Sequence, residues 1–293
     1  MNYFLMICYI FLSCNTPKSI QLKQTNSQHN IPYNINEPDI AIELPFELKE
    51  ASGLTIGSNK NILSVIQDEE GAIYYFDIDK KVISNKIIFF DKGDFEGIEA
   101  INDSTYYAVK SSGTLFKIEI KGGIAFPTKI NTPLNKSYDI EGLAFDPQTN
   151  NLLLASKGPG SDSNSIARKI FSYNIEKQQF NILPYFELTD DAIQSYFKKY
   201  PDEISKFENN VLRFGPSGIA IHPKSKLIYI IASSGKLFFV IDPVAKSIIH
   251  LEKIDKKIHA QPEGITFDQN GTMYICNEGK KGVPKLYGFY PKS

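Results

Sequence analysis

The sequence predicts an all-β fold, a five-bladed β-propeller, and the first observation behind this prediction is a recurring motif. Its general form is acid-x-acid-Gly followed by Leu or Ile, best developed at 139–147 and echoed at 50–55, 94–99, 215–223 and 261–268. A period of about 45 residues, built from short strands, is typical of propeller blades. The motif glycines, which are 44, 45, 76 and 46 residues apart, are Gly53, Gly97, Gly142, Gly218 and Gly264.

The second observation is the plan that the five repeats share. Each glycine begins a short apolar strand, and a turn rich in Pro, Asn, Asp and Gly follows because these residues suit turn dihedrals. A second strand is apolar almost throughout, as expected when neighbouring blades cover both faces of a sheet. We expect second strands at 62–66, 106–109, 152–155, 227–231 and 273–276, and third strands at 73–77, 115–119, 170–174, 237–241 and 286–289.

The third observation concerns closure of the ring. Four repeats have a weaker fourth strand, expected at 83–90, 126–130, 180–188 and 248–254, whereas the fifth repeat ends after three strands. A lone alternating segment at 39–45 precedes the first repeat, and we expect it to pair with the last blade and close the ring. A six-bladed ring is the alternative, if the long step between Gly142 and Gly218 hides a degenerate blade.

We expect the extra residues of that long step to form a helical insertion at about 189–210. Thr189 can cap a helix, and Asp190 and Asp191 fall in its first turn, where the helix dipole favours acids. Apolar residues follow at helical spacing until Pro201 breaks the pattern. We expect the insertion to lie over one face of the propeller, either as a lid on a pocket or as a packing element.

The first residues indicate export. The apolar run at 3–12 is too short to span a bilayer, which takes ~20 residues, but it suits the core of a signal peptide. The run ends in a sequence that resembles a bacterial lipobox, with cleavage before Cys14 and a lipid on its sulfur. An ordinary secretory leader and a cytosolic chain are alternatives, because Met1 and Asn2 offer no positive charge. The expected division is a signal peptide at 1–13, a lipid-anchored flexible tether at 14–38 and the propeller at 39–293.

Composition narrows the set of partners. The chain has 293 residues, 42% of them hydrophobic, and its net charge of −1 gives no reason to expect nucleic-acid binding. We expect a monomer in the cell envelope, attached by its lipid to the plasma or outer membrane, with a protein as a further candidate partner. Cys276 is the one cysteine left in the mature chain, so no internal disulfide is expected and its thiol is expected to be buried.

Candidate functional residues emerge when the repeats are aligned on their glycines. The first strand of each propeller blade lines the central channel, so equivalent positions form rings around one mouth. The residues three before the glycine are Glu50, Asp94, Asp139, Gly215 and Gln261, and those one before it are Ser52, Glu96, Glu141, Ser217 and Glu263. Six carboxylates are therefore expected at one mouth, as candidate metal ligands: Glu50, Asp94, Glu96, Asp139, Glu141 and Glu263.

Such a cluster needs compensation, because carboxylates at close range raise one another's pKa and destabilise the site. Carboxylate and hydroxyl oxygens are hard ligands, so Ca²⁺ or Mg²⁺ fits better than a soft metal. The alternative is a structural role, in which the acids bond to backbone N–H groups and Lys110, Lys157 and Arg213 neutralise the remainder. The turns at 68–71 and 277–279 either face the same mouth or are solvated.

Other site chemistry finds no support in the sequence. The four histidines lack the spacing of a zinc site, and no nucleophile elbow, P-loop or dinucleotide-binding fingerprint is present. No catalytic residue is therefore assigned.

The repeat starts of the form Glu/Asp-x-Glu/Ser-Gly-Leu/Ile, the segment 68–74, the core at 94–98 and the segment 277–279 together resemble the SdiA-regulated family, the YjiK/CarP-type bacterial propellers. The resemblance covers roughly residues 45–290. It implies a membrane-associated propeller of the cell envelope that is linked to calcium homeostasis and has no established enzymatic activity. Gly215 and Ser217 depart from the acidic pattern, so the ring of acids is incomplete.

Three hypotheses of function follow. The first is a non-enzymatic envelope lipoprotein that binds Ca²⁺, or a ligand through it, at the acidic mouth. The second is a Ca²⁺-dependent phosphoesterase or lactonase-like hydrolase, in which the carboxylates hold an ion that activates water. The third is a protein-interaction scaffold, since a fold alone does not determine function.

Overall fold

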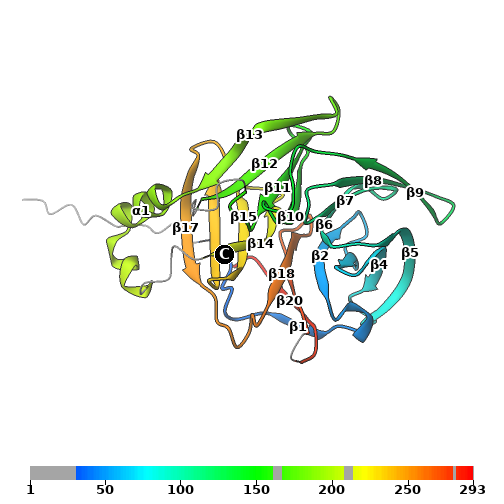
Figure 1. The fold of residues 1–293 in the computed structure, drawn as a ribbon. Helices are drawn as coiled ribbons and strands as arrows, with labels where there is room; N and C mark the ends of the chain where they lie inside the picture. Colours follow the sequence, from blue (N-terminus) through cyan, green and yellow to red (C-terminus); the bar gives the residue numbers. More distant parts are fainter. Residues whose placement is uncertain (1–30, 161–166, 208–213, 280–281, 293) are drawn as a thin grey trace, which may run out of the picture.

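Twenty strands form five antiparallel four-stranded sheets around a common axis (Figure 1). This computed structural model describes residues 31–160, 167–207, 214–279 and 282–292. Blade 1 consists of β2 (Ala51–Ile56), β3 (Ile62–Gln67), β4 (Glu70–Asp77) and β5 (Val82–Lys92). Blade 2 consists of β6 (Phe95–Asn102), β7 (Thr105–Lys110), β8 (Leu115–Lys121) and β9 (Ile124–Ile130). Blade 3 consists of β10 (Ile140–Asp146), β11 (Asn151–Ser156), β12 (Arg168–Asn174) and β13 (Gln179–Leu188).

Blade 4 follows the helical insertion, and the last blade joins the two ends of the chain. Blade 4 consists of β14 (Gly215–Ile221), β15 (Ile228–Ser234), β16 (Leu237–Asp242) and β17 (Ser247–Lys253). Blade 5 consists of β18 (Pro262–Phe267), β19 (Met273–Asn277), β20 (Lys285–Phe289) and β1 (Ile40–Glu43).

The ring closes as the sequence predicts. Strand β1 pairs antiparallel with β20, from Ile40 opposite Gly288 to Glu43 opposite Lys285. The first strands β2, β6, β10, β14 and β18 contact one another in succession, and β18 contacts β2. Five blades are therefore confirmed, and the six-bladed alternative is wrong for the residues that the structure describes.

The core lies in the seams between blades. Between blades 5 and 1, for example, Leu63 and Phe76 are fully buried and belong to one cluster with Tyr274 and Leu286. Ile42 of β1 joins the same cluster, so the N-terminal strand contributes apolar burial as well as hydrogen bonds. Apolar side chains on both faces of each sheet explain why the second strands are hydrophobic throughout rather than alternating.

A β-bulge occurs at the motif in every blade. The register between the first and second strands shifts between residues 51 and 53, 95 and 97, 140 and 142, 216 and 218, and 262 and 265. A bulge inserts an unpaired residue and re-aims its side chain. In each blade the shift encloses the residue immediately before the glycine.

Close approach of neighbouring blades explains the motif glycines. A Cβ on Gly53 would lie 3.0 Å from Cα of Gly97 in the next blade, and one on Gly218 would lie 2.4 Å from the carbonyl oxygen of Glu263. These distances leave no room for a side chain, so the first strands meet backbone to backbone around the axis.

The helical insertion is present but does not cover the axis. Helix α1 (Asp190–Lys199) is capped by Thr189, whose Oγ1 accepts a hydrogen bond from the N–H of Ala192 at 3.1 Å. A short 3-10 helix, η2 (Pro201–Lys206), follows. Helix α1 packs against the outer strands β13 and β17 at the rim of the ring (Figure 1). The expected position over one face is therefore wrong, because the buried face of α1 completes the seam between blades 3 and 4.

The packed chain begins before β1. Tyr33 donates a hydrogen bond to the carbonyl oxygen of Gly271 at 2.6 Å, and Ile35 is fully buried between blades 4 and 5. Ordered structure thus includes residues of the segment expected to be a tether, while Cys14 and the signal segment lie outside the described residues. None of the helices in the described part is sufficiently long and apolar to cross a bilayer.

Candidate functional site

The bulged residues surround the channel axis. Each lines a narrow cavity of about 10 Å³, which is roughly enough for one water molecule. Five aliphatic residues from the same strands line this cavity as well and narrow the channel: Leu54, Ile98, Leu143, Ile219 and Ile265. We use the term acidic mouth for the end of the channel at which the first strands begin, and inner ring for its bulged residues Ser52, Glu96, Glu141, Ser217 and Glu263.

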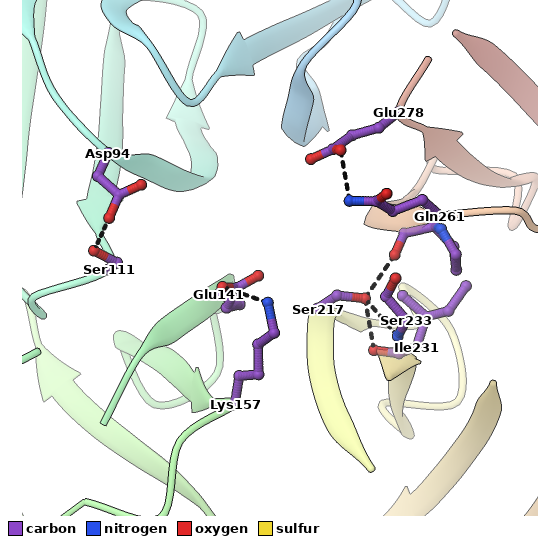
Figure 2. A network of polar contacts seen from close by, with 10 residues as sticks. Asp94, Ser111, Glu141, Lys157, Ser217, Ile231, Ser233, Gln261 and Glu278 are labelled. Carbon is purple, nitrogen blue, oxygen red and sulfur yellow. Dashed lines mark hydrogen bonds and ion pairs between the residues drawn. The ribbon is translucent and has the colours of Figure 1, made fainter. Parts of the chain in front are cut away.

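The two serines of the inner ring tie blades together. Ser52 donates a hydrogen bond to the carbonyl oxygen of Phe95 at 2.6 Å. Ser217 donates to the carbonyl oxygen of Pro262 at 2.7 Å and accepts from the N–H of Ser233 at 3.1 Å (Figure 2). Both serines are buried, so they serve the contact with the next blade where other blades carry an acid.

The three carboxyl groups of the inner ring have raised pKa values. Burial raises the pKa of Glu263 to about 8, and the charges of Glu141 and Glu278 add to the effect. Burial, followed by the charge of Glu141, also raises the pKa of Glu96 far above its ordinary value. Glu96 therefore holds a proton at neutral pH, and the inner ring carries less negative charge than its three glutamates suggest.

Lys157 provides the positive charge nearest to the inner ring. Its Nζ lies 2.9 Å from Oε1 of Glu141, whose side chain is only 8% exposed (Figure 2). Burial raises the pKa of Glu141 to about 7, although the charge of Lys157 opposes this rise. The pair thus reduces the negative charge at the axis itself.

The three other predicted residues lie outside the axial cavity. Asp94 accepts a short hydrogen bond from the hydroxyl of Ser111 (Figure 2). Asp139 has a left-handed backbone with φ of 50°, and burial raises its pKa while Lys157 opposes the rise. Glu50 lies at the seam between blades 5 and 1, and Lys49 Nζ is 4.0 Å from its Oε1. Asp94 and Asp139 still act on the inner ring, because a side-chain hydrogen bond links Asp94 to Glu96 and the charges of Asp139 and Asp94 contribute to the raised pKa of Glu141.

Three acids do come within the range of one metal ion. One carboxylate oxygen from each of Glu50, Asp68 and Glu278 lies within 4.8 Å of the others. Among the described residues, no other group of three or more Asp, Glu, His or Cys side chains brings its ligand atoms this close together. All three are partly exposed, and Oε2 of Glu278 accepts a hydrogen bond from Nε2 of Gln261 at 2.5 Å (Figure 2). We call this group the acidic trio.

Sequence reasoning named only Glu50 of the acidic trio as a ligand. Asp68 follows β3 of blade 1, and Glu278 follows β19 of blade 5, so each is the first residue after a second strand. The same position is occupied by Ser111 in blade 2 and Lys157 in blade 3. Aligning the repeats on this position as well as on the glycine would have shown that blades 1 and 5, adjacent in the closed ring, both carry an acid there.

The three histidines among the described residues do not add to this site. His222 lies near the end of β14, where Nε2 is 2.9 Å from the hydroxyl of Tyr33. His259 is fully buried, with Nε2 2.8 Å from the carbonyl oxygen of Ile35, and His250 pairs with Glu252 on β17. In the part of the chain that the structure describes, the chemistry of the acidic mouth is therefore that of carboxylate oxygens, hydroxyls and the ammonium groups of Lys49 and Lys157.

A family model identifies the family of this chain. The model of the SdiA-regulated family matches residues 40–283. The chain belongs to the SdiA-regulated family. The match runs from β1 to β19 and includes the acidic trio, and it confirms the resemblance seen in the motifs.

Solved structures similar to this SdiA-regulated propeller show its fold alone. The crystal structure of a nidogen/laminin complex matches with a TM-score of 0.52 and 15% identity, over 80% of this chain and 74% of that chain. The glutaminyl cyclase of Myxococcus xanthus matches with a TM-score of 0.55 and 11% identity, over 87% and 95% of the respective chains. No curated protein sequence matches the chain.

Proposed function

We propose that this SdiA-regulated propeller is a non-enzymatic protein of the cell envelope that binds Ca²⁺ at its acidic mouth. The single observation that carries the proposal is the acidic trio of Glu50, Asp68 and Glu278. In this proposal Cys14 holds the lipid anchor, and the bound ion links the protein to calcium homeostasis.

Ligand chemistry supports Ca²⁺ at the acidic trio. Two oxygens on opposite sides of a Ca²⁺ ion, each at about 2.4 Å, lie about 4.8 Å apart, so three oxygens that lie within 4.8 Å of one another can share one such ion. Ca²⁺ takes six to eight oxygen ligands in a flexible arrangement, and the partial exposure of the trio leaves room for water to complete the shell. Mg²⁺ is smaller and requires a near-ideal octahedron, so Ca²⁺ is the better fit.

Charge also favours the trio over the inner ring. In the inner ring Glu96 retains a proton and Lys157 pairs with Glu141, so an incoming cation meets less negative charge there. In the trio, three carboxylates lie within reach of one doubly charged ion, and Nζ of Lys49 approaches Oε1 of Glu50 at 4.0 Å. Repulsion within the trio is relieved when a cation binds, which supplies part of the binding free energy.

Titration calorimetry with Ca²⁺ tests this proposal. We expect a saturable heat in the wild-type chain and its loss in the double variant Glu50→Gln/Glu278→Gln. The matched control is Glu187→Gln, which changes an exposed glutamate on the outer strand β13. The proposal is wrong if the wild type gives no saturable heat, or if the double variant and the control give equal heats. A hydrolytic function would instead appear as EDTA-sensitive turnover of phosphoester or lactone substrates.

A further inference from the structure

A second pocket lies at the end of the channel opposite the acidic mouth. Its volume is about 310 Å³, at the lower end of the range of about 300–1,000 Å³ that is usual for small-molecule sites. Side chains near the ends of four first strands form its apolar part: Ile56, Ala100, Ile221 and Phe267. Polar residues from the adjoining turns, among them Ser58, Asn102, Asp103, Asp268 and Gln269, form its rim. We call this the opposite pocket.

The small side chain of Ala100 helps to explain why the opposite pocket is open. The position three residues after the motif glycine is occupied by Ile56, Ala100, Phe145, Ile221 and Phe267 in blades 1 to 5. Blade 2 alone has a small side chain there, so the lining is open beside Ala100. A larger residue at this position would fill part of the pocket, as the isoleucine and phenylalanine side chains of the other blades fill the equivalent space.

The opposite pocket is separate from the acidic mouth. The five aliphatic side chains on the axis, with a cavity of only about 10 Å³ between them, leave no passage for anything larger than water. The lining residues of the opposite pocket and those of the axial cavity do not overlap. A ligand of the opposite pocket would therefore bind independently of a metal ion at the acidic trio.

Two fixed carboxylates stand at the rim of this apolar pocket. Asp103 accepts hydrogen bonds from the N–H of Ser58 at 3.0 Å and from its hydroxyl at 2.6 Å. Asp268, which is 5% exposed, accepts through Oδ1 from the N–H groups of Asn270 at 2.9 Å and Thr272 at 2.7 Å. These bonds hold both side chains in place without neutralising them.

Positive charge is missing from this rim. Throughout the described residues, neither Asp103 nor Asp268 forms an ion pair with a lysine, arginine or histidine. The hydrogen bonds from Ser58 hold the pKa of Asp103 below its ordinary value, so this carboxylate is ionised at neutral pH. Negative charge beside a low-dielectric wall attracts cations and repels anions.

We infer that the opposite pocket binds a small organic cation, a molecule with an apolar body and an ammonium group. The apolar body would occupy the space beside Ala100 against Ile221 and Phe267, and the ammonium would lie at the rim between Asp103 and Asp268. Such a ligand gains from apolar burial and from charge, whereas a neutral analogue gains only from the first and an anion is repelled.

Benzylammonium, benzyl alcohol and benzoate serve as matched probes, since they share an aromatic body and differ in charge. We expect titration calorimetry of the full chain at neutral pH to show benzylammonium binding about tenfold or more tightly than benzyl alcohol, and no binding of benzoate. Ala100→Leu should abolish benzylammonium binding, and Asp268→Asn should remove its advantage over the alcohol. Neither variant should change the Ca²⁺ heat, and Glu50→Gln/Glu278→Gln should leave benzylammonium binding intact.

Several outcomes would overturn the inference. The inference is wrong if the wild type does not bind benzylammonium, or if it binds benzylammonium and benzyl alcohol equally tightly. It is also wrong if Ala100→Leu binds benzylammonium as tightly as the wild type. Thermal melts establish that each variant is folded. If Ala100→Leu does not fold, Asp103→Asn and Asp268→Asn decide the matter, and unchanged discrimination between the two probes in both variants would refute the role of the rim.

Discussion

Lys157 and Glu141, both of blade 3, form an ion pair across 2.9 Å at the channel axis. The glutamate is almost entirely buried, while the side chain of the lysine is one-third exposed. The lysine extends from the end of the second strand to the bulged residue of the first strand. This ion pair thus connects two positions of the repeat that are acidic in other blades.

Replacement of Lys157 by Met should destabilise the propeller in a pH-dependent way. In the wild type, Lys157 opposes the rise of the Glu141 pKa to about 7, so the glutamate is ionised above that pH; without the lysine it would be an unpaired buried charge or would have to take up a proton. We expect Lys157→Met to lower the free energy of unfolding by about 2 kcal/mol at about pH 8 and by less at about pH 5, where Glu141 takes up a proton. Urea denaturation at the two pH values measures this. The double variant Lys157→Met/Glu141→Gln should recover most of the loss, and an equal loss at both pH values would contradict the prediction.

Glu99 should make stability fall with rising pH. Burial raises its pKa to about 8 from 4.5, although Thr55 and backbone N–H groups of Ala100 and Phe145 bond to it. A raised carboxyl pKa gives a contribution that is fully present below about pH 4.5 and is lost as the pH rises through about 8. Glu99→Gln removes the ionisation, so the variant should exceed the wild type by roughly 1–3 kcal/mol at about pH 9 and lose that advantage at about pH 4.

Urea midpoints across this pH range provide the measurement for Glu99. Glu187→Gln on the exposed edge of β13 is the control and should follow the wild type throughout. A constant difference between Glu99→Gln and the wild type would mean that the carboxyl group does not titrate in this window.

Close packing of the first strands should make Gly218 intolerant of a methyl group. A Cβ there would lie 2.4 Å from the carbonyl oxygen of Glu263, so neighbouring backbone has to move. We expect Gly218→Ala to cost roughly 1–3 kcal/mol in urea unfolding. Gly282→Ala, where nothing lies within 4 Å, should change stability by less than about 0.5 kcal/mol. Similar costs in the two variants would show that the axis tolerates expansion.

Ring closure by β1 should depend on Ile42. This side chain is 5% exposed and packs in the seam between blades 5 and 1. Ile42→Ala should lower the free energy of unfolding by about 2–4 kcal/mol, because burial is lost and a cavity remains. Ala41→Ser, at the exposed neighbouring position on the same strand, should have little effect. Thermal denaturation of both variants measures the difference, and an unchanged midpoint for Ile42→Ala would argue against a stabilising closure.

The fold could be predicted from the sequence because each repeat carries local signals for its strands and turns. Gly142 and its equivalents mark the close approach of first strands, and the turn residues separate strands that are apolar on both faces. Closure by the segment at 39–45 followed from a simple count, since the last repeat lacked one strand. The position of α1 did not follow, because a pattern such as Ile193, Tyr196 and Phe197 shows that a helix has a buried face without showing which seam receives it.

Only part of the candidate site could be predicted from the sequence. The aligned motif correctly brought Glu96, Glu141 and Glu263 around one axis, because bulges direct these side chains inward. The motif gave no distance between carboxylates, so it could not show that Glu50, Asp94 and Asp139 lie outside the axial cavity. The acidic trio depends on the last blade meeting the first, so predicting it requires the ring closure to be combined with the acids that follow the second strands of blades 1 and 5.

The pairing of β1 with β20 has a consequence for how the protein is made. Ile40 pairs with Gly288, which lies 248 positions later in the sequence, so the fifth sheet is complete only after nearly the whole polypeptide has been synthesised. Until then, the growing chain presents β20 or its neighbours as an open edge, which is prone to pairing with other molecules. A ribosome that stalls late in translation, or a protease that removes the chain up to Glu43, would release a chain with an open, aggregation-prone last blade.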